Sequence, residues 1–106
     1  MDAVDIDEMF QSLGAVTIKR MFGGKGVYHQ GRILAIEFHD EMLLKADAAS
    51  APDFAEAGCR QWSYPGKTPE KPVLMPYWSI PVEAFDDPDV MALWVSKAYH
   101  AALRAK

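Results

Sequence analysis

Apolar residues recur at helical spacing near the start of the chain: Ile6, Met9, Phe10 and Leu13. This stripe predicts a helix over roughly residues 2–13. Asp2 or Asp5 could cap its first turn, and Gly14 stands where a helix ends. The pattern therefore predicts that the chain opens with an amphipathic helix.

From Ala15 the apolar period shortens to two, which is typical of strands. Alternation puts Val16, Ile18, Arg20 and Phe22 on one side of a first strand and Thr17, Lys19 and Met21 on the other. We expect residues 23–26, rich in glycine, to break this strand, and further strands at 27–29, 33–38 and 42–46. The turns are short, with Gly31 able to take a positive φ, so an antiparallel meander is predicted, with strand 33–38 near the sheet centre.

The second half begins with a predicted helix. Ser50 could cap it, Pro52 is tolerated in its first turn, and Gly58 ends it. Strands are expected at 61–64 and 77–80. The four prolines within residues 65–76 predict a loop between them, and residues 81–85 look like a single helical turn.

A last helix is marked by Asp87 as its cap and Pro88 in its first position. Its inner stripe is formed by Val90, Trp94, Ala98 and Ala101. The whole pattern predicts one domain over residues 1–106 of the α+β class. We expect two layers, an antiparallel sheet of about five to six strands with flanking N-terminal, middle and C-terminal helices.

The charge balance bears on possible partners. Eleven Lys and Arg stand against fifteen Asp and Glu, a formal net charge of −4. A domain that grips nucleic acid by itself usually carries a basic excess, so direct nucleic-acid binding is not expected. One cysteine allows no intramolecular disulfide. With an acidic N-terminus and no long apolar run, we expect a cytoplasmic protein without a membrane partner.

Residues 15–36 form a block that contains bases and no acid: Lys19, Arg20, Lys25 and Arg32. These four are the candidate interaction surface. Arg20 is the most informative of them, because alternation places it on the core face. Its charge must then either reach solvent at the sheet rim, with its stem packed on Phe22, or hold an acidic ligand or partner.

Catalytic and metal-binding patterns are not found. Cys59, His29, His39 and His100 lack the spacing of metal ligands. Cys59 follows a helix end, so we expect a structural cysteine rather than a nucleophile. Residues 23–26 lead into a strand, unlike a phosphate-binding loop, which leads into a helix. We expect no enzyme activity, no catalytic residue, no cofactor and no metal.

Four aromatic residues flank the proline-rich segment: Trp62, Tyr64, Tyr77 and Trp78. They could form a sticky surface or a platform on which bases stack. The alternative is that they are core, because aromatic side chains supply much of the burial in a small domain. We favour the core.

The segment Arg20-Met21-Phe22-Gly23-Gly24, followed by Gly26-Val27-Tyr28, resembles the N-terminal signature of the TfoX/Sxy family. Further similar segments follow in order: Leu43–Asp47, Gly58 with Trp62-Ser63-Tyr64, Tyr77–Pro81, and the helix over Asp87–Ala102. The resemblance thus covers nearly the whole chain as an N-terminal domain of that family. It implies an α+β fold and a structural role for the signature residues Arg20, Met21, Phe22, Gly23, Gly24 and Gly26.

The resemblance also implies a non-enzymatic regulator of competence, which acts on transcription of DNA-uptake genes beside a transcription activator. Full-length regulators of this kind carry a further helical domain after the first. Since these 106 residues end with the first, we expect an adaptor that binds protein and has its own target. The alternatives are direct nucleic-acid binding through the 15–36 hairpin and small-molecule binding. We also expect that the chain can form a homodimer through a sheet edge.

Overall fold

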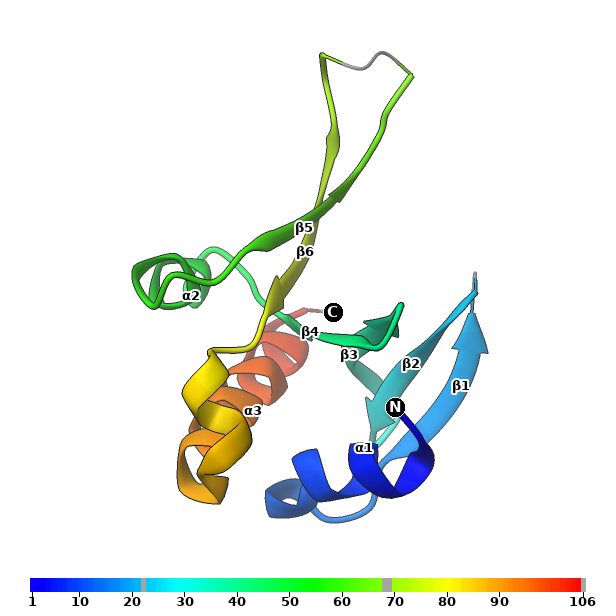
Figure 1. Cartoon of the computed structure of the whole chain (residues 1–106), viewed down its shortest axis with the longest axis vertical. Helices are drawn as coiled ribbons and strands as arrows, with labels where there is room; N and C mark the ends of the chain where they lie inside the picture. The colour runs from blue at the N-terminus through cyan, green and yellow to red at the C-terminus, as the bar shows by residue number, and fades with distance from the viewer. Residues whose placement is uncertain (22, 68–69, 106) are drawn as a thin grey trace.

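The computed structural model describes residues 1–21, 23–67 and 70–105. In these residues a six-stranded antiparallel sheet of order β1-β2-β3-β4-β6-β5 carries the helices (Figure 1). The strands are β1 (Thr17–Met21), β2 (Gly24–His29), β3 (Arg32–Phe38), β4 (Glu41–Lys45), β5 (Gln61–Tyr64) and β6 (Val73–Ser79). The helices are α1 (Ala3–Met9), α2 (Ala51–Glu56) and α3 (Pro88–Arg104), with short 3₁₀ helices η1 (Gln11–Leu13) and η2 (Val82–Asp86). The predicted α+β class is confirmed.

Both terminal helices begin where the sequence predicts. The Asp2 carboxylate accepts a hydrogen bond from the Asp5 amide at 2.9 Å and caps α1. The predicted helix over 2–13 is interrupted at Phe10, because its last turn tightens into η1. At α3, Asp87 accepts from the amides of Asp89 and Val90 at 3.0 and 3.4 Å, which confirms the predicted cap.

The predicted break at residues 23–26 is wrong in its extent, since β2 begins at Gly24 and pairs with β1 through Gly24 and Gly26. The physical reason is close packing against β3. A Cβ placed on Gly24 would lie 2.3 Å from the carbonyl oxygen of Glu37. The glycine therefore lets β2 approach its neighbour instead of ending the strand.

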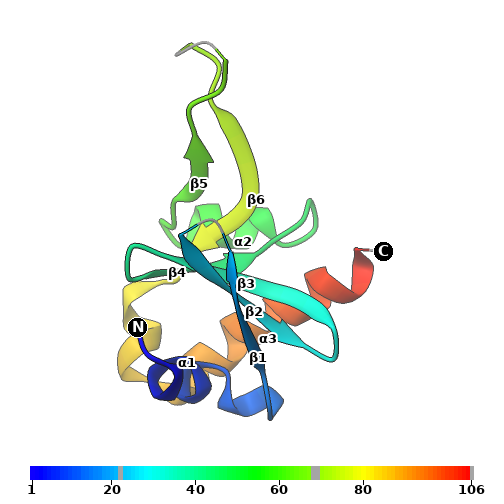
Figure 2. The same cartoon turned by 90° about the vertical axis from the view of Figure 1, so that its right-hand side faces the viewer.

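The predicted loop over 65–76 is also too long. The β5–β6 hairpin projects from the body of the molecule (Figures 1 and 2), and β6 already begins at Val73. Pro76 is tolerated in this strand because the pairing uses its carbonyl, which accepts from the Ala46 amide at 2.9 Å, and not an N–H. Thr68 and Pro69 of the predicted loop lie outside the described residues.

Ser50 is not the side-chain cap of α2, contrary to the prediction. It adopts an αR backbone conformation, and its hydroxyl accepts from the Asp47 amide at 3.0 Å. Asp47 acts here instead: its Oδ1 accepts from the amides of Ala49 at 3.2 Å and Ser50 at 3.1 Å. Aspartate side chains commonly bond to amides two or three residues ahead, and this turn leads the chain into the helix.

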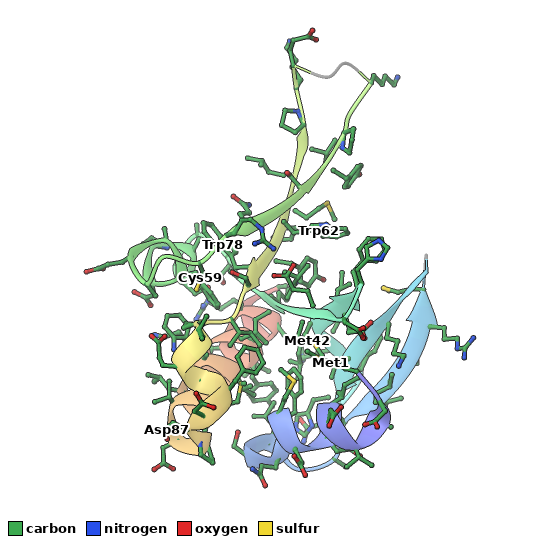
Figure 3. The ribbon with its side chains drawn as sticks, in the orientation of Figure 1. Met1, Met42, Cys59, Trp62, Trp78 and Asp87 are labelled. Atoms are coloured by element: carbon green, nitrogen blue, oxygen red, sulfur yellow. The ribbon has the colours of Figure 1, made fainter. Side chains whose placement is uncertain are left out.

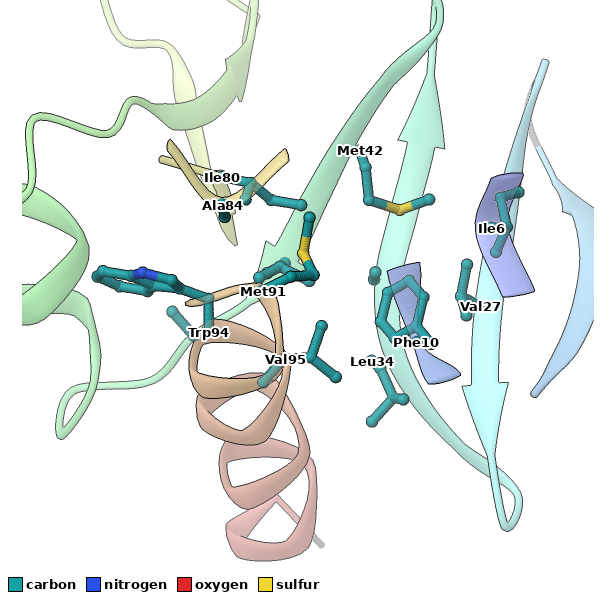
Figure 4. Close-up of a cluster of buried hydrophobic side chains, with 14 of the residues drawn as sticks. Ile6, Phe10, Val27, Leu34, Met42, Ile80, Ala84, Met91, Trp94 and Val95 are labelled. Carbon is teal, nitrogen blue, oxygen red and sulfur yellow. The ribbon is translucent and has the colours of Figure 1, made fainter. Parts of the chain in front are cut away.

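The core lies between one face of the sheet and the helices. Phe10 from η1's start, Val27, Leu34 and Met42 from the strands, and Val95 from α3 are all buried there (Figure 4). Phe54 of α2 packs on Trp94 of α3, with ring centroids 4.8 Å apart. We call this side of the sheet the covered face, because α1, α2 and α3 all pack on it.

Candidate interaction surfaces

The four bases of the 15–36 block point to different places. Lys19 has its ammonium 4.9 Å from the centroid of the Tyr28 ring. Lys25 donates to the Met1 carbonyl at 2.8 Å, and Arg32 donates to the Ala102 carbonyl at 3.2 Å at the end of α3. The structure therefore does not bring these bases together as one surface that could follow a phosphate backbone.

Arg20 lies beside Lys25 across the β1–β2 pair and is exposed. Both line a hollow of about 420 Å³ together with Met21, Gly23, Gly24 and Glu37. Glu37 is 6% exposed and accepts a hydrogen bond from the Met1 ammonium at 3.1 Å. Phe22, on which the Arg20 stem was predicted to pack, lies outside the described residues. An acidic ligand at Arg20 stays a prediction.

The glycines of the family signature have a geometric reason to be glycine. Gly23 takes a φ of +80° in the turn between β1 and β2. A Cβ on Gly26 would lie 2.9 Å from Cε1 of Tyr28 and 3.4 Å from Cε of Met21. The signature thus shapes a hairpin whose strands pack tightly and over which the Tyr28 ring folds.

The other side of the sheet, which we call the open face, carries aromatic side chains. Alternation defines it, because Ile36 pairs with Leu43 while the flanking pairs Ala35–Leu44 and Glu37–Met42 point to the core. Its aromatic members are Tyr28, Phe38, Trp62, Tyr64 and Tyr77. Among the residues that the structure describes, no helix packs on this face.

Contacts on the open face join three of these rings, Phe38, Trp62 and Tyr64, into a strip. Trp62 lies 5.9 Å from Phe38 and 6.0 Å from Tyr64, measured between ring centroids. The Lys45 ammonium lies 5.6 Å from the centroid of the Tyr77 ring. Lys19 has a similar position near Tyr28, at 4.9 Å. Burial, with Tyr28 nearby, raises the pKa of Tyr77. Lysine ammonium groups therefore stand near two further rings of the open face, Tyr28 and Tyr77.

The structure divides the aromatic group that flanks the proline-rich segment. Trp78 packs against Phe54 on the covered face, with centroids 6.2 Å apart, so the core interpretation is right for it. Tyr77 is buried but on the open face, and Tyr64 is 44% exposed. Sequence reasoning did not single out Tyr28, Phe38 or Lys45. Their alternation with core-facing neighbours was a usable signal.

Cys59, His29 and His100 each have contacts of their own. Cys59 is half-buried against the core, and burial raises the pKa of its thiol, which disfavours the thiolate. His29 contacts the Ala15 carbonyl through Nδ1 at 2.8 Å, and His100 contacts the Ser96 hydroxyl at 3.4 Å. Within residues 1–21, 23–67 and 70–105, no three His, Cys, Asp or Glu side chains gather closely enough to hold a metal ion.

An ion pair fastens the end of α3 to the loop before α2. Arg104 donates to Asp47 from Nε at 2.6 Å and from a terminal nitrogen at 3.0 Å. The guanidinium holds the pKa of Asp47 well below its usual range, and the amide and hydroxyl of Ser50 lower it further. We call this ion pair the clamp, because it joins the C-terminal end of α3 to the turn that precedes α2.

The sequence is similar to one protein family. Over the described ranges, no helix has the length and apolar character needed to cross a bilayer. No curated protein matches the chain. A family model, the TfoX N-terminal domain, matches residues 8–102, which include the signature hairpin, the open face and all but the last two residues of α3. The match covers nearly the whole chain, and the chain therefore belongs to the TfoX N-terminal domain family.

Proposed function

We propose that this domain is a non-enzymatic regulatory module that binds another protein through the open face of its sheet. In keeping with the family, the regulated process is competence and the transcription of DNA-uptake genes. The partner is a protein of the transcription apparatus, such as a transcription activator. The domain supplies a shaped surface and no bond-breaking chemistry.

The observation that carries the proposal is the aromatic strip Phe38–Trp62–Tyr64 on a face that no described helix covers. Aromatic residues with a partly apolar environment are the usual anchors of protein interfaces. Lys19 and Lys45 place positive charge beside Tyr28 and Tyr77 on the same face. Binding of a partner that removes such a face from water lowers the free energy of the system.

The test is affinity capture with the intact chain from extract of its own cells, compared with a Trp62→Ala/Tyr64→Ala variant. We expect the wild-type chain to recover a transcription-related protein and the variant to lose it. Leu103→Ala, which removes an exposed apolar side chain from α3, is the matched control and should recover the protein as before. Recovery of no transcription-related protein by the wild type, or equal recovery by the double variant, contradicts the proposal.

Self-association through the strand edges is a separate proposal about partners. β1 and β5 are the two ends of the sheet order and carry unpaired backbone groups on their outer sides. Sedimentation at high protein concentration tests this. A mass of two chains supports pairing, and a monomer mass up to the highest concentration rejects it.

A further inference from the structure

Two segments without any lysine or arginine meet in the fold. They are residues 1–18 and 72–96, and each contains four acids. The first forms α1 and η1, and the second includes η2 and the first half of α3. Figures 1 and 2 both show α1 beside η2 and the start of α3. An acidic region therefore forms at this end of the molecule.

A groove of about 340 Å³ runs between these elements. Its apolar lining includes Met9 of α1, Met91 of α3, and Ala84 and Phe85 of η2. Phe85 is 51% exposed, although it is a large apolar residue. Methionine side chains are flexible and polarisable, so a groove that they line can adapt to different apolar anchors.

Acids line the groove and bases do not. Asp5 and Glu8 of α1 are both exposed along it. Further acids stand on the same elements or at their N-caps: Asp2, Asp7, Glu83, Asp86, Asp87 and Asp89. The Met1 ammonium also reaches the groove, but Glu37 and Asp40 bind it. The electrostatic field at this surface therefore favours a cationic occupant.

We propose that this groove, which we call the acidic groove, docks a basic amphipathic helix of a partner protein. Apolar side chains of that helix fill the space between Met9, Phe85 and Met91, and its lysines or arginines face Asp5 and Glu8. The groove lies between helices and its lining combines apolar side chains with carboxylates, which suits the apolar and basic sides of an amphipathic helix. This surface is separate from the open face, so the domain would hold two partners or two parts of one partner.

The probe is a fluorescein-labelled 14-residue peptide of leucine and lysine, with leucine at helical i, i+3, i+4 and i+7 positions. A second peptide with glutamate in place of lysine is its matched control. Fluorescence anisotropy with the intact chain should show saturable one-to-one binding of the basic peptide and none of the acidic one. Affinity should fall about tenfold or more between low and physiological salt, because exposed charges are screened.

Variants separate the acidic groove from general attraction between an acidic protein and a basic peptide. Asp5→Asn/Glu8→Gln should weaken binding about fivefold or more, and Phe85→Ala by a similar factor. Glu56→Gln/Glu70→Gln removes the same charge from exposed positions outside the groove, on α2 and near the hairpin tip, and should change the affinity less than about twofold. Circular dichroism confirms that each variant is folded.

Equal losses in the two charge variants, or full binding by Phe85→Ala, would overturn the proposal. So would an absence of binding by the wild-type chain. The Trp62→Ala/Tyr64→Ala variant keeps the acidic groove and should bind the peptide normally. Failure of the peptide experiment therefore does not contradict the open-face proposal. Failure of the affinity capture does not contradict the acidic-groove proposal.

Discussion

The two faces of the sheet carry similar side chains with different fates. On the covered face, Phe54 and Leu34 are fully buried beneath or between helices. On the open face, Trp62 and Tyr64 contact each other and solvent (Figure 3 labels Trp62 near the base of the hairpin). The difference teaches that the helices bury aromatic side chains on one face, whereas on the other face Tyr64 stays 44% exposed.

The largest expected effect comes from breaking the covered face. Phe54→Ala should lower the free energy of unfolding by about 3–5 kcal/mol, because the ring packs between Trp78 and Trp94 and its loss leaves a cavity. Urea denaturation followed by tryptophan fluorescence measures this. A loss below about 1 kcal/mol would show that Phe54 is not part of the core.

The tight β2–β3 pairing, which sets the register of both faces, gives the next effect. Gly24→Ala should cost about 1–3 kcal/mol, because its Cβ would meet the Glu37 carbonyl oxygen at 2.3 Å. Gly31→Asn is the comparison, since that turn position has open space and a φ of +79°, which asparagine tolerates. Its cost in the same urea experiment should be smaller. The reverse order would contradict the close approach of the two strands.

The clamp that holds α3 over the covered face has a smaller effect and a defined pH dependence. Asp47→Asn should lower stability by about 1 kcal/mol at neutral pH, through the loss of the Arg104 pair and weaker turn bonds. Because the folded-state pKa of Asp47 is depressed, its contribution is complete above the unfolded pKa of about 4. It is lost as the pH falls from there through the folded pKa.

Urea midpoints of the wild-type chain and Asp47→Asn, measured from pH 7 down to about pH 2, check this prediction. The difference between the urea midpoints of the two proteins should be constant near neutral pH and should decrease below about pH 4. A gap that widens in acid would mean that the carboxylate is not stabilised by its partners in the folded state.

The smallest expected effect comes from truncating an aromatic side chain on the open face. Tyr64→Ala should change the free energy of unfolding by no more than about 0.5 kcal/mol, because the side chain is 44% exposed and lies on the projecting hairpin. The pair Phe54→Ala and Tyr64→Ala thus compares two aromatic truncations in one urea experiment. Similar losses at both positions would show that the open face belongs to the core.

Much of the fold could be predicted from local signals. The caps at Asp2 and Asp87, the period of two through β1, the unbroken aliphatic run of β3 and the stripe of α3 each reflect chemistry within a few residues. The error at Gly24 arises from a distant contact, because this glycine packs against the Glu37 carbonyl oxygen of β3. At Ser50 the signal is local but ambiguous, because Asp47, three residues earlier, can accept from the same turn amides. At Val73, pairing with Tyr64 of β5 extends the strand into the proline-rich segment.

The interaction surfaces were less predictable for the same reason. The bases from Lys19 to Arg32 are neighbours along the chain, but the strands turn them toward the open face, Met1 and the end of α3. Conversely, Phe38 and Trp62 are far apart along the chain and lie side by side in the sheet. Strand pairing decides which residues share a face, and pairing between distant strands is not written in one strand's sequence.

The acidic groove has walls from opposite ends of the chain, so it exists only after α3 has crossed the sheet. The unfolded polypeptide offers no such cleft, and an occupant therefore selects the native state. At a hundredfold excess over its dissociation constant, an occupant would add about 2.7 kcal/mol to the folding equilibrium. Occupancy of the groove would then be coupled to folding, and release of the occupant would return the chain to its intrinsic stability.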